Sequence, residues 1–269
     1  MQGRVAYLTR RDEIREFEET SWELMPWVGT YLGRHGRLQG TFGWFQMNSD
    51  KDGITLTPNN RDDLFRLGLR LGYDSRDSWR APHRGWKNEL EMLRTGGFLG
   101  GDGDFWSFTA DIQRYQPLGK QTLALVLLTS LQSGDVGTDT PRYMQYTLGG
   151  ANSIRGYDFK ELGQVLYGKN QLIGTLEYQH TLIPLRSLRL FRWSFSVGMQ
   201  AAAFADIGTA WDQSEQFAAR RFRAGYGLGL RFIVPSTEMV RLDVGFSEAG
   251  TEFHFGTWSK FTAQRLRLR

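Results

Sequence analysis

The sequence predicts an all-β protein, a transmembrane antiparallel up-and-down β-barrel of about 12 strands. Three observations predict it: alternating segments recur at nearly regular intervals, their polar face is rich in arginine and glycine, and aromatic residues gather near their ends. The 269 residues include 32 glycines and 14% aromatics but only 7 prolines, which favours strands over helices. Cysteine is absent, so disulfides and thiolate metal sites are unavailable.

The alternation has a period of two residues. From Phe65 to Tyr73 every odd position is apolar, while the even positions are arginine or glycine. The ranges 191–203, 225–234 and 240–246 alternate in the same way. Each of these strands therefore has one apolar face and one polar or small face.

A soluble β-sandwich is the alternative, because its strands alternate too. The long strands, the arginine-rich face and an aromatic girdle favour a membrane barrel whose polar face lines the lumen. The tryptophans expected in the girdle are Trp44, Trp86, Trp106, Trp193, Trp211 and Trp258. No apolar run approaches the roughly 20 residues of a membrane helix, so a chain of this kind crosses a bilayer with strands.

The expected strands, in chain order, span residues 2–10, 20–33, 37–48, 63–74, 86–97, 104–116, 121–133, 171–183, 190–208, 222–235, 239–248 and 251–261. Starting from a periplasmic N-terminus, the turns at 117–120 and 235–238 are periplasmic and short, and the long connections lie outside. We expect a single barrel domain over residues 1–269 in the bacterial outer membrane. The N-terminus has no apolar signal segment, so we expect a mature chain.

The longest connection, about residues 134–170, contains the segment Leu148-Gly149-Gly150-Ala151-Asn152-Ser153-Ile154-Arg155-Gly156-Tyr157. Two later strands carry acidic residues on their predicted lumen face. Glu177 follows Gly174-Thr175-Leu176, and Asp206 lies within Phe204-Ala205-Asp206-Ile207-Gly208, on the same face as Arg192, Ser194 and Gln200. A further motif joins Tyr73-Asp74-Ser75-Arg76-Asp77 to Pro82-His83-Arg84-Gly85-Trp86.

These motifs resemble those of the BamA and two-partner-secretion transporter superfamily, the bacterial surface antigen family of outer-membrane assembly and translocation barrels. The resemblance covers about residues 63–261. It implies that the long extracellular loop folds back into the lumen and sets Arg155 against Glu177 and Asp206. An arginine alone in a low-dielectric lumen would be costly, so carboxylate partners are physically required.

The resemblance also nominates the other members of each motif. The loop motif comprises Gly149, Gly150, Ile154, Arg155, Gly156 and Tyr157, the strand motif Phe204 and Gly208, and the turn motif Asp74, Arg76, Asp77 and Gly85. The three loop glycines are expected to adopt positive φ or to pack closely in the lumen. A surface arginine beside ordinary turn glycines is the alternative.

The sequence also departs from the family pattern. A typical member has 16 strands, eleven before the arginine-bearing loop and five after it. Here we also count five after the loop, but only about seven before it. The missing strands would be N-terminal. Members usually carry periplasmic POTRA domains before the barrel, and the predicted strands leave no room for one, so we expect a short member lacking POTRA domains.

Three functions are compatible with this sequence. The first is assistance in inserting or translocating proteins at the outer membrane, as the resemblance implies. The second is a channel or membrane anchor without assembly activity, working as a homo-oligomer or with a separate periplasmic partner. The third is an outer-membrane enzyme, which we do not expect because no G-x-S-x-G elbow or Ser/His/Asp set is visible.

The expected partners are outer-membrane lipid and protein substrates. Nucleic acid is not expected, because the 33 basic residues are dispersed among 29 acidic ones and the net charge is only +4. Neither a cofactor nor a metal is expected: the four histidines form no close ligand pair. The acidic segments at 48–53 and 100–104 lack the spacing of a calcium loop and are interpreted as polar turns.

Overall fold

The computed structural model describes residues 2–79, 81–190, 193–233 and 239–256, except for the side chains of 2–4, 187–190, 193–196 and 215. Twelve antiparallel strands form one sheet in chain order. They are β1 (Gln2–Asp12), β2 (Phe17–Leu32), β3 (Gly36–Ser49), β4 (Arg61–Asp74), β5 (Gly85–Gly96), β6 (Asp104–Leu118), β7 (Gln121–Gln132), β10 (Asn170–Leu190), β11 (Trp193–Trp211), β12 (Arg223–Ile233), β13 (Val240–Ser247) and β14 (Gly250–Gly256). The expected all-β antiparallel architecture is confirmed.

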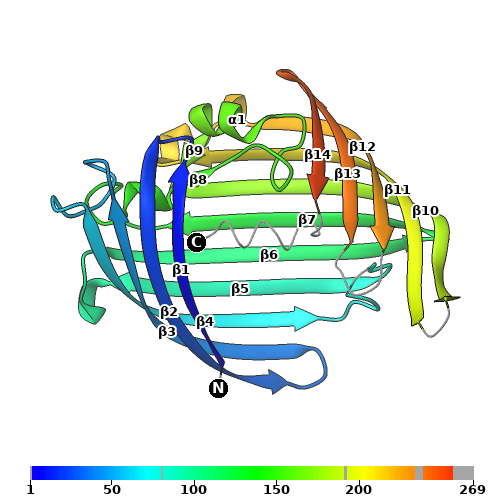
Figure 1. Ribbon diagram of the computed structural model, residues 1–269, viewed down its shortest axis with the longest axis horizontal. Helices are drawn as coiled ribbons and strands as arrows, with labels where there is room; N and C mark the ends of the chain where they lie inside the picture. The colour runs from blue at the N-terminus through cyan, green and yellow to red at the C-terminus, as the bar shows by residue number, and fades with distance from the viewer. Residues whose placement is uncertain (1, 80, 191–192, 234–238, 257–269) are drawn as a thin grey trace.

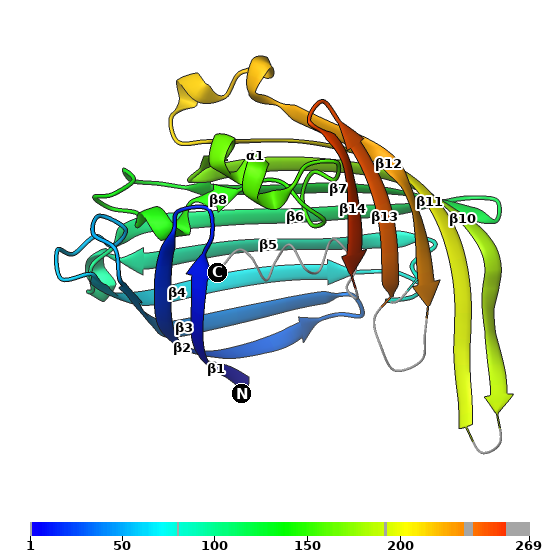
Figure 2. The same cartoon turned by 45° about the horizontal axis from the view of Figure 1, so that its top comes forward.

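The sheet curves strongly around the connection between β7 and β10. Figures 1 and 2 show β1 and β2 on one side and β12–β14 on the other, both bent in front of the central strands. Within the described residues, β1 pairs only with β2 and β14 only with β13. Each of these two strands therefore presents one edge outside the sheet.

The burial pattern is the inverse of that in a soluble sheet. In β4, Arg66 is only 7% exposed, whereas the neighbouring Leu67 and Leu71 are 44% and 45% exposed. In β10, Glu177 is 3% exposed and Leu176 45%. Apolar side chains thus point outward and polar ones into the concave face, which excludes the soluble sandwich and fits a barrel wall facing lipid.

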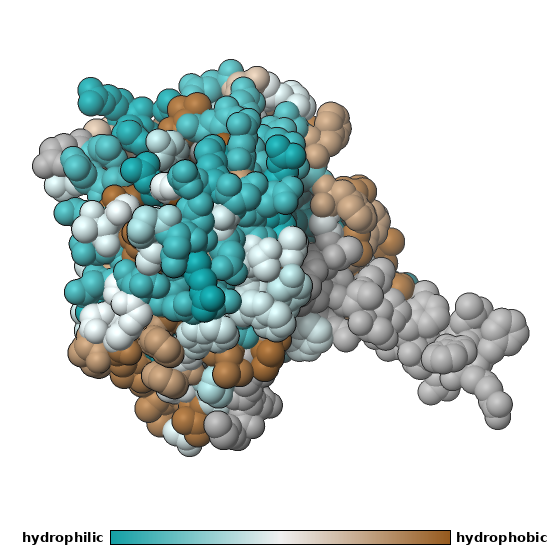
Figure 3. All heavy atoms as spheres, turned by 60° about the vertical axis from the view of Figure 1, so that its left-hand side comes forward, coloured by the Kyte–Doolittle hydropathy of each residue, from teal (hydrophilic) through white to brown (hydrophobic). Residues whose placement is uncertain are grey.

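Most of the long connections lie at one end of the strands, here called the loop end; the opposite end is the turn end and carries one long connection, 75–84. The loop end carries the connections 13–16, 50–60, 97–103, 133–169 and 212–222. Figure 3 brings this end forward and shows it covered largely by polar residues, with apolar residues gathered along its lower margin. Among the described residues, no helix has the length and apolar character needed to cross a bilayer.

The connection between β7 and β10 has secondary structure of its own, which the sequence pattern did not predict. It contains β8 (Tyr146–Thr147), α1 (Phe159–Val165) and β9 (Tyr167–Gly168), and β8 pairs with β9. The helix begins after Asp158, whose Oδ1 accepts a hydrogen bond from the Lys160 amide at 2.8 Å, as an N-cap does. Short 3₁₀ turns span Gly97–Leu99, Arg142–Met144, Ser214–Gln216 and Ala219–Arg221.

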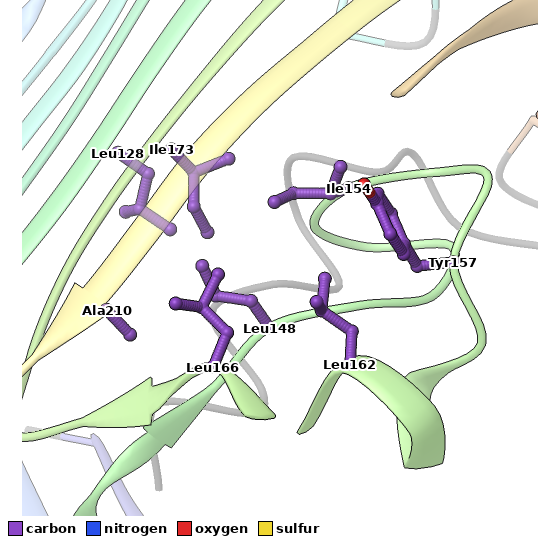
Figure 4. Packing of buried hydrophobic residues seen from close by; sticks show 8 residues of the cluster. All are labelled: Leu128, Leu148, Ile154, Tyr157, Leu162, Leu166, Ile173 and Ala210. Atoms are coloured by element: carbon purple, nitrogen blue, oxygen red, sulfur yellow. The ribbon is translucent and has the colours of Figure 1, made fainter. Parts of the chain in front are cut away.

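This connection packs against the concave wall through apolar contacts. Figure 4 shows its side chains facing those of the sheet; the buried cluster comprises Leu148, Ile154, Tyr157, Leu162 and Leu166 from the connection and Leu128, Ile173 and Ala210 from the wall. Burial of side chains of this size stabilises by about 1.5–3 kcal/mol each. The connection is therefore part of the folded core.

The clearest departure from the expected strands is β10, which continues to Leu190 instead of ending near 183. Its pairing with β11 shifts register between Thr181 and Ile183 and again between Ile183 and Arg186. These irregularities flank Pro184, which cannot donate to a ladder, and they break the alternation on which the expected boundary rested. Residues 257–261 of the expected last strand, 234–235 of the expected 222–235 strand and Trp258 lie outside the described residues.

Candidate functional site

The connection between β7 and β10, residues 133–169, is called the long loop, and its tip approaches the concave wall formed by β10–β13. Gly149, Gly150 and Gly156 have φ values of 115°, 79° and 100°, a region that residues with a Cβ rarely adopt. The Gly150 amide donates to the Tyr157 carbonyl at 2.9 Å, and the Ser153 hydroxyl bridges to Gly149. This compact tip projects Arg155 into the wall.

Arg155 is fully buried and makes a two-pronged ion pair with Asp206. Its Nε donates to Asp206 Oδ2 at 2.7 Å and its Nη2 to Asp206 Oδ1 at 3.0 Å, while the backbone amide of Arg155 donates to Oδ2 at 3.1 Å. Its Nη1 donates to Glu177 Oε2 at 2.9 Å. The guanidinium carbon lies 3.3 Å from the centre of the Phe204 ring, with which it forms a cation–π contact.

The structure adds charged partners that the sequence motifs do not include. Arg155 Nη1 also donates to Asp243 Oδ2 at 3.3 Å. Arg231 donates to Glu177 at 2.9 Å and to Asp243 as well, so the two carboxylates share two guanidinium groups. The Arg155 network, defined as Arg155, Glu177, Asp206, Arg231 and Asp243, ties the loop to four adjacent strands.

Electrostatics keeps Arg155 charged. Burial by itself would lower the pKa of the Arg155 guanidinium, but the negative charges of Asp206 and Glu177 more than offset that effect and hold the pKa above its ordinary value. Asp206 also accepts from the Thr175 hydroxyl at 2.8 Å, and Glu177 accepts from the Gln179 amide at 3.0 Å. These hydrogen bonds give the buried carboxylate oxygens the partners that water would otherwise supply.

Glycines in the wall make room for the loop tip. A Cβ at Gly225 would lie 1.8 Å from the Arg155 carbonyl oxygen, and one at Gly245 would lie 2.4 Å from the Gly156 amide nitrogen. At Gly208, which belongs to the strand motif, a Cβ would lie 3.2 Å from Ile154 Cδ1. The loop tip therefore packs directly against the backbone of these strands, in space that larger side chains would fill.

A second set of contacts ties the same loop to the first hairpin. Arg15 donates to the Gln145 carbonyl at 3.0 Å, and Lys160 pairs with Glu13 at 2.9 Å. The loop therefore bridges the β1–β2 hairpin and the wall formed by β10–β13, which lie near opposite edges of the sheet.

The turn motif lies at the turn end, away from the Arg155 network. Asp74 accepts from Arg76 Nε at 2.9 Å and Nη2 at 2.7 Å, and Asp77 accepts from the amides of His83 and Arg84 at 2.9 and 3.2 Å. Gly85 has φ 113°, and a Cβ there would lie 2.4 Å from the Ser75 carbonyl oxygen. These residues close the β4–β5 connection on itself.

Replacing Asp77 with alanine is expected to lower the free energy of unfolding by about 1–3 kcal/mol, because two amides lose their acceptor. Urea unfolding of the refolded protein measures the change. Asp135→Ala is the matched control, since within the described residues the exposed Asp135 side chain accepts no hydrogen bond. Equal stability of the two variants would contradict a closing function for Asp77.

The other residues named from the sequence are not part of the Arg155 network, and some of them lie outside the described residues. Trp44 donates to Asp63 at 3.0 Å near the loop end, and Trp211 packs on Phe217. Trp86 is exposed at the turn end, and Trp106 lies near the start of β6 at the loop end, beside Phe108. Gln200 is buried on the concave face. The side chains of Arg192, Trp193 and Ser194 lie outside the described residues.

The alternation of their strands places Asp243 and Arg231, the two network residues not predicted from the motifs, on the predicted lumen face. Asp243 and Arg231 both occupy the polar parity of their strands, the same parity that placed Glu177 and Asp206. Alternation gives the face of each residue, but the pairing of Gly229 with Asp243 and of Arg231 with Arg241 is set by the strand register. The sequence alone therefore did not select them from the other polar residues of that face.

Comparison with known proteins identifies the family. The Omp85 superfamily domain matches residues 9–261. The outer membrane protein assembly factor BamA of Nitratidesulfovibrio vulgaris is 26% identical over 190 residues, which is 66% of this chain and 22% of that protein. The chain thus spans less than a quarter of this curated relative.

Solved structures share the fold. BamA from Haemophilus ducreyi lacking POTRA domains 1–3 superposes with a TM-score of 0.70 at 15% identity, covering 94% of this chain and 56% of that chain. CdiB from Acinetobacter baumannii gives a TM-score of 0.57 at 16% identity, covering 88% of this chain and 42% of the other. Because the family domain spans almost the entire sheet, this chain belongs to the Omp85 superfamily and is a bacterial outer-membrane protein.

Proposed function

We propose that this protein assists the insertion or translocation of other proteins at the outer membrane, without a catalytic step. The observation that carries the proposal is the buried Arg155 network, which fixes one loop to β10–β13 while the same loop contacts the β1–β2 hairpin. The name of the Nitratidesulfovibrio vulgaris relative, an assembly factor, supports the same activity.

The two strands at the ends of the sheet supply a physical route. Within the described residues β1 and β14 each have one paired neighbour, so each offers backbone donors and acceptors along its other edge. A strand of an incoming protein can add to such an edge by β-augmentation. The loop would hold the flanks of both edges in a fixed relation while a substrate strand pairs.

The test is insertion of an unfolded barrel into liposomes with and without the refolded protein. We expect faster insertion with the unaltered chain, loss of the acceleration with Arg155→Ala, and full acceleration with Arg220→Ala, an exposed loop arginine outside the network. Heat-modifiable gel mobility confirms that each variant is folded. No acceleration by the folded, unaltered chain would overturn the proposal.

Ion conductance in planar bilayers provides the second arm of the same experiment. A folded protein that conducts ions but does not accelerate insertion would support the channel function. A protein that does neither would be a membrane anchor, and a search for a periplasmic partner would follow.

A further inference from the structure

A second polar site lies on the concave face, separate from the Arg155 network. It is a cavity of about 310 Å³ between the wall formed by β4–β7 and the loop segment that contains Tyr143 and Met144. The exposed residues Arg10 and Arg11 also line it, and Arg10 pairs with Glu19 at 3.0 Å. A volume of this size holds a small molecule.

Arg66 in β4 lines this cavity and has an unusual environment for a buried cation. Its guanidinium carbon lies 4.5 Å from the centre of the Phe45 ring, and its Nη2 lies 3.8 Å from the sulfur of Met144. Its Nε has no hydrogen-bond partner. Within the described residues no carboxylate lies within 4.0 Å of this guanidinium, whereas Arg155 has three.

The acids that line the cavity, Asp12, Glu13 and Glu91, are already paired, and Glu13 pairs with Lys160 at 2.9 Å. Glu91 accepts from Arg70 Nε at 2.6 Å, and Asp12 accepts from Arg15 at 3.0 Å. The charges of Glu23 and Glu91 act on Arg66, but from beyond ion-pair distance, so among the described residues its buried guanidinium has no direct carboxylate partner. Burial without such a partner is costly, and Arg66 therefore calls for an anion from outside the described protein groups.

Two further buried polar atoms at the same cavity lack partners. Thr95 in β5 is directly opposite Arg66 in the β4–β5 register, and its hydroxyl oxygen makes no hydrogen bond. Side chains opposite each other on one face of an antiparallel pair lie about 4.5–5.5 Å apart at their Cβ atoms. Gln132 in β7 holds its amide nitrogen against the Met144 carbonyl and the Tyr146 hydroxyl, which leaves its Oε1 unpartnered.

We propose that this cavity binds a small oxyanion, a carboxylate or phosphate group, with Arg66 as its counter-charge. The Thr95 hydroxyl donates to the same anion, and the Gln132 oxygen accepts from a protonated oxygen or a water that accompanies it. Arg11, an exposed arginine that lines the same cavity, adds positive charge near the site. The site is independent of the Arg155 network and does not rest on the proposed function.

The test uses the full chain refolded in a neutral detergent at constant ionic strength. Trifluoroacetate followed by ¹⁹F NMR is the carboxylate probe, inorganic phosphate followed by ³¹P NMR is the phosphate probe, and trifluoroethanol is the uncharged control. We expect saturable binding of at least one of the two anions and none of trifluoroethanol. The anion that binds shows whether the site takes a carboxylate or a phosphate group.

Arg66→Gln is expected to weaken binding by about tenfold or more, because a charge-assisted hydrogen bond is lost. Arg61→Gln is the matched control: it removes the same charge from the same strand, but Arg61 is exposed and pairs with Asp63. Arg66→Lys, which keeps the charge, should recover part of the affinity.

Thr95→Val provides a second variant of nearly unchanged shape, in case Arg66→Gln does not fold, and it should bind several-fold more weakly. Saturable binding lost in Arg66→Gln or weakened in Thr95→Val, but retained in Arg61→Gln, supports the site. The proposal is overturned if neither anion binds saturably, or if the folded Arg66 and Thr95 variants bind as tightly as the unaltered chain.

Discussion

Replacing Arg155 with alanine is expected to lower the free energy of unfolding by about 3–5 kcal/mol, the typical result of removing one partner from a buried ion pair. Asp206 would lose both prongs of its guanidinium partner, and its carboxylate would remain buried beside Glu177. Arg231 would still neutralise Glu177 and Asp243 in part, so the damage centres on Asp206.

Urea unfolding of the refolded protein, followed by the fluorescence of its 9 tryptophans, measures this change. Arg220→Ala removes an exposed arginine from a loop and should shift the midpoint little, since surface substitutions usually change stability by less than about 0.5 kcal/mol. Arg155→Lys should fall between the two, because an ammonium keeps the charge but cannot form the two-pronged pair. Equal midpoints for Arg155→Ala and Arg220→Ala would contradict a structural latch.

Replacing Gly225 with alanine is expected to displace the loop tip from the wall. The added Cβ would meet the Arg155 carbonyl oxygen at 1.8 Å, where no flexible side-chain end can yield. Overpacking of this kind costs about 1–3 kcal/mol, so the displaced state should become about fivefold or more populated. The network would then lose its central cation without any change to a charged residue.

Trypsin provides the measurement, because it cleaves after arginine and Arg155 is fully buried when the loop is seated. We expect cleavage after Arg155 to accelerate in Gly225→Ala and to stay slow in Gly40→Ala. Gly40 lies in β3, and a Cβ there would meet nothing within 4 Å. Unchanged protection of Arg155 in a folded Gly225→Ala variant would show that the wall yields instead of the loop.

The amino-acid sequence by itself determined the strands and their faces. Because side chains alternate across a strand, the period-two pattern at 65–73 identified β4, and the same parity placed Glu177 and Asp206 on the concave face. The glycine-rich segment ending in Ile154-Arg155-Gly156-Tyr157, together with the strand and turn motifs, was enough to indicate the family.

Only the tertiary structure decided which polar residues meet. Alternation fixes a face but not a register, so Asp243 and Arg231 could not be selected as members of the network from the sequence. The bulges that carry β10 past Pro184 and the helix that begins after Asp158 depend on local geometry that breaks the period-two pattern. In the sequence, Arg66 looks like any other arginine on the polar face of a strand. Only the fold shows that, within the part of the chain that the structure describes, it has no carboxylate in direct contact, because its neighbours come from β3 and the long loop.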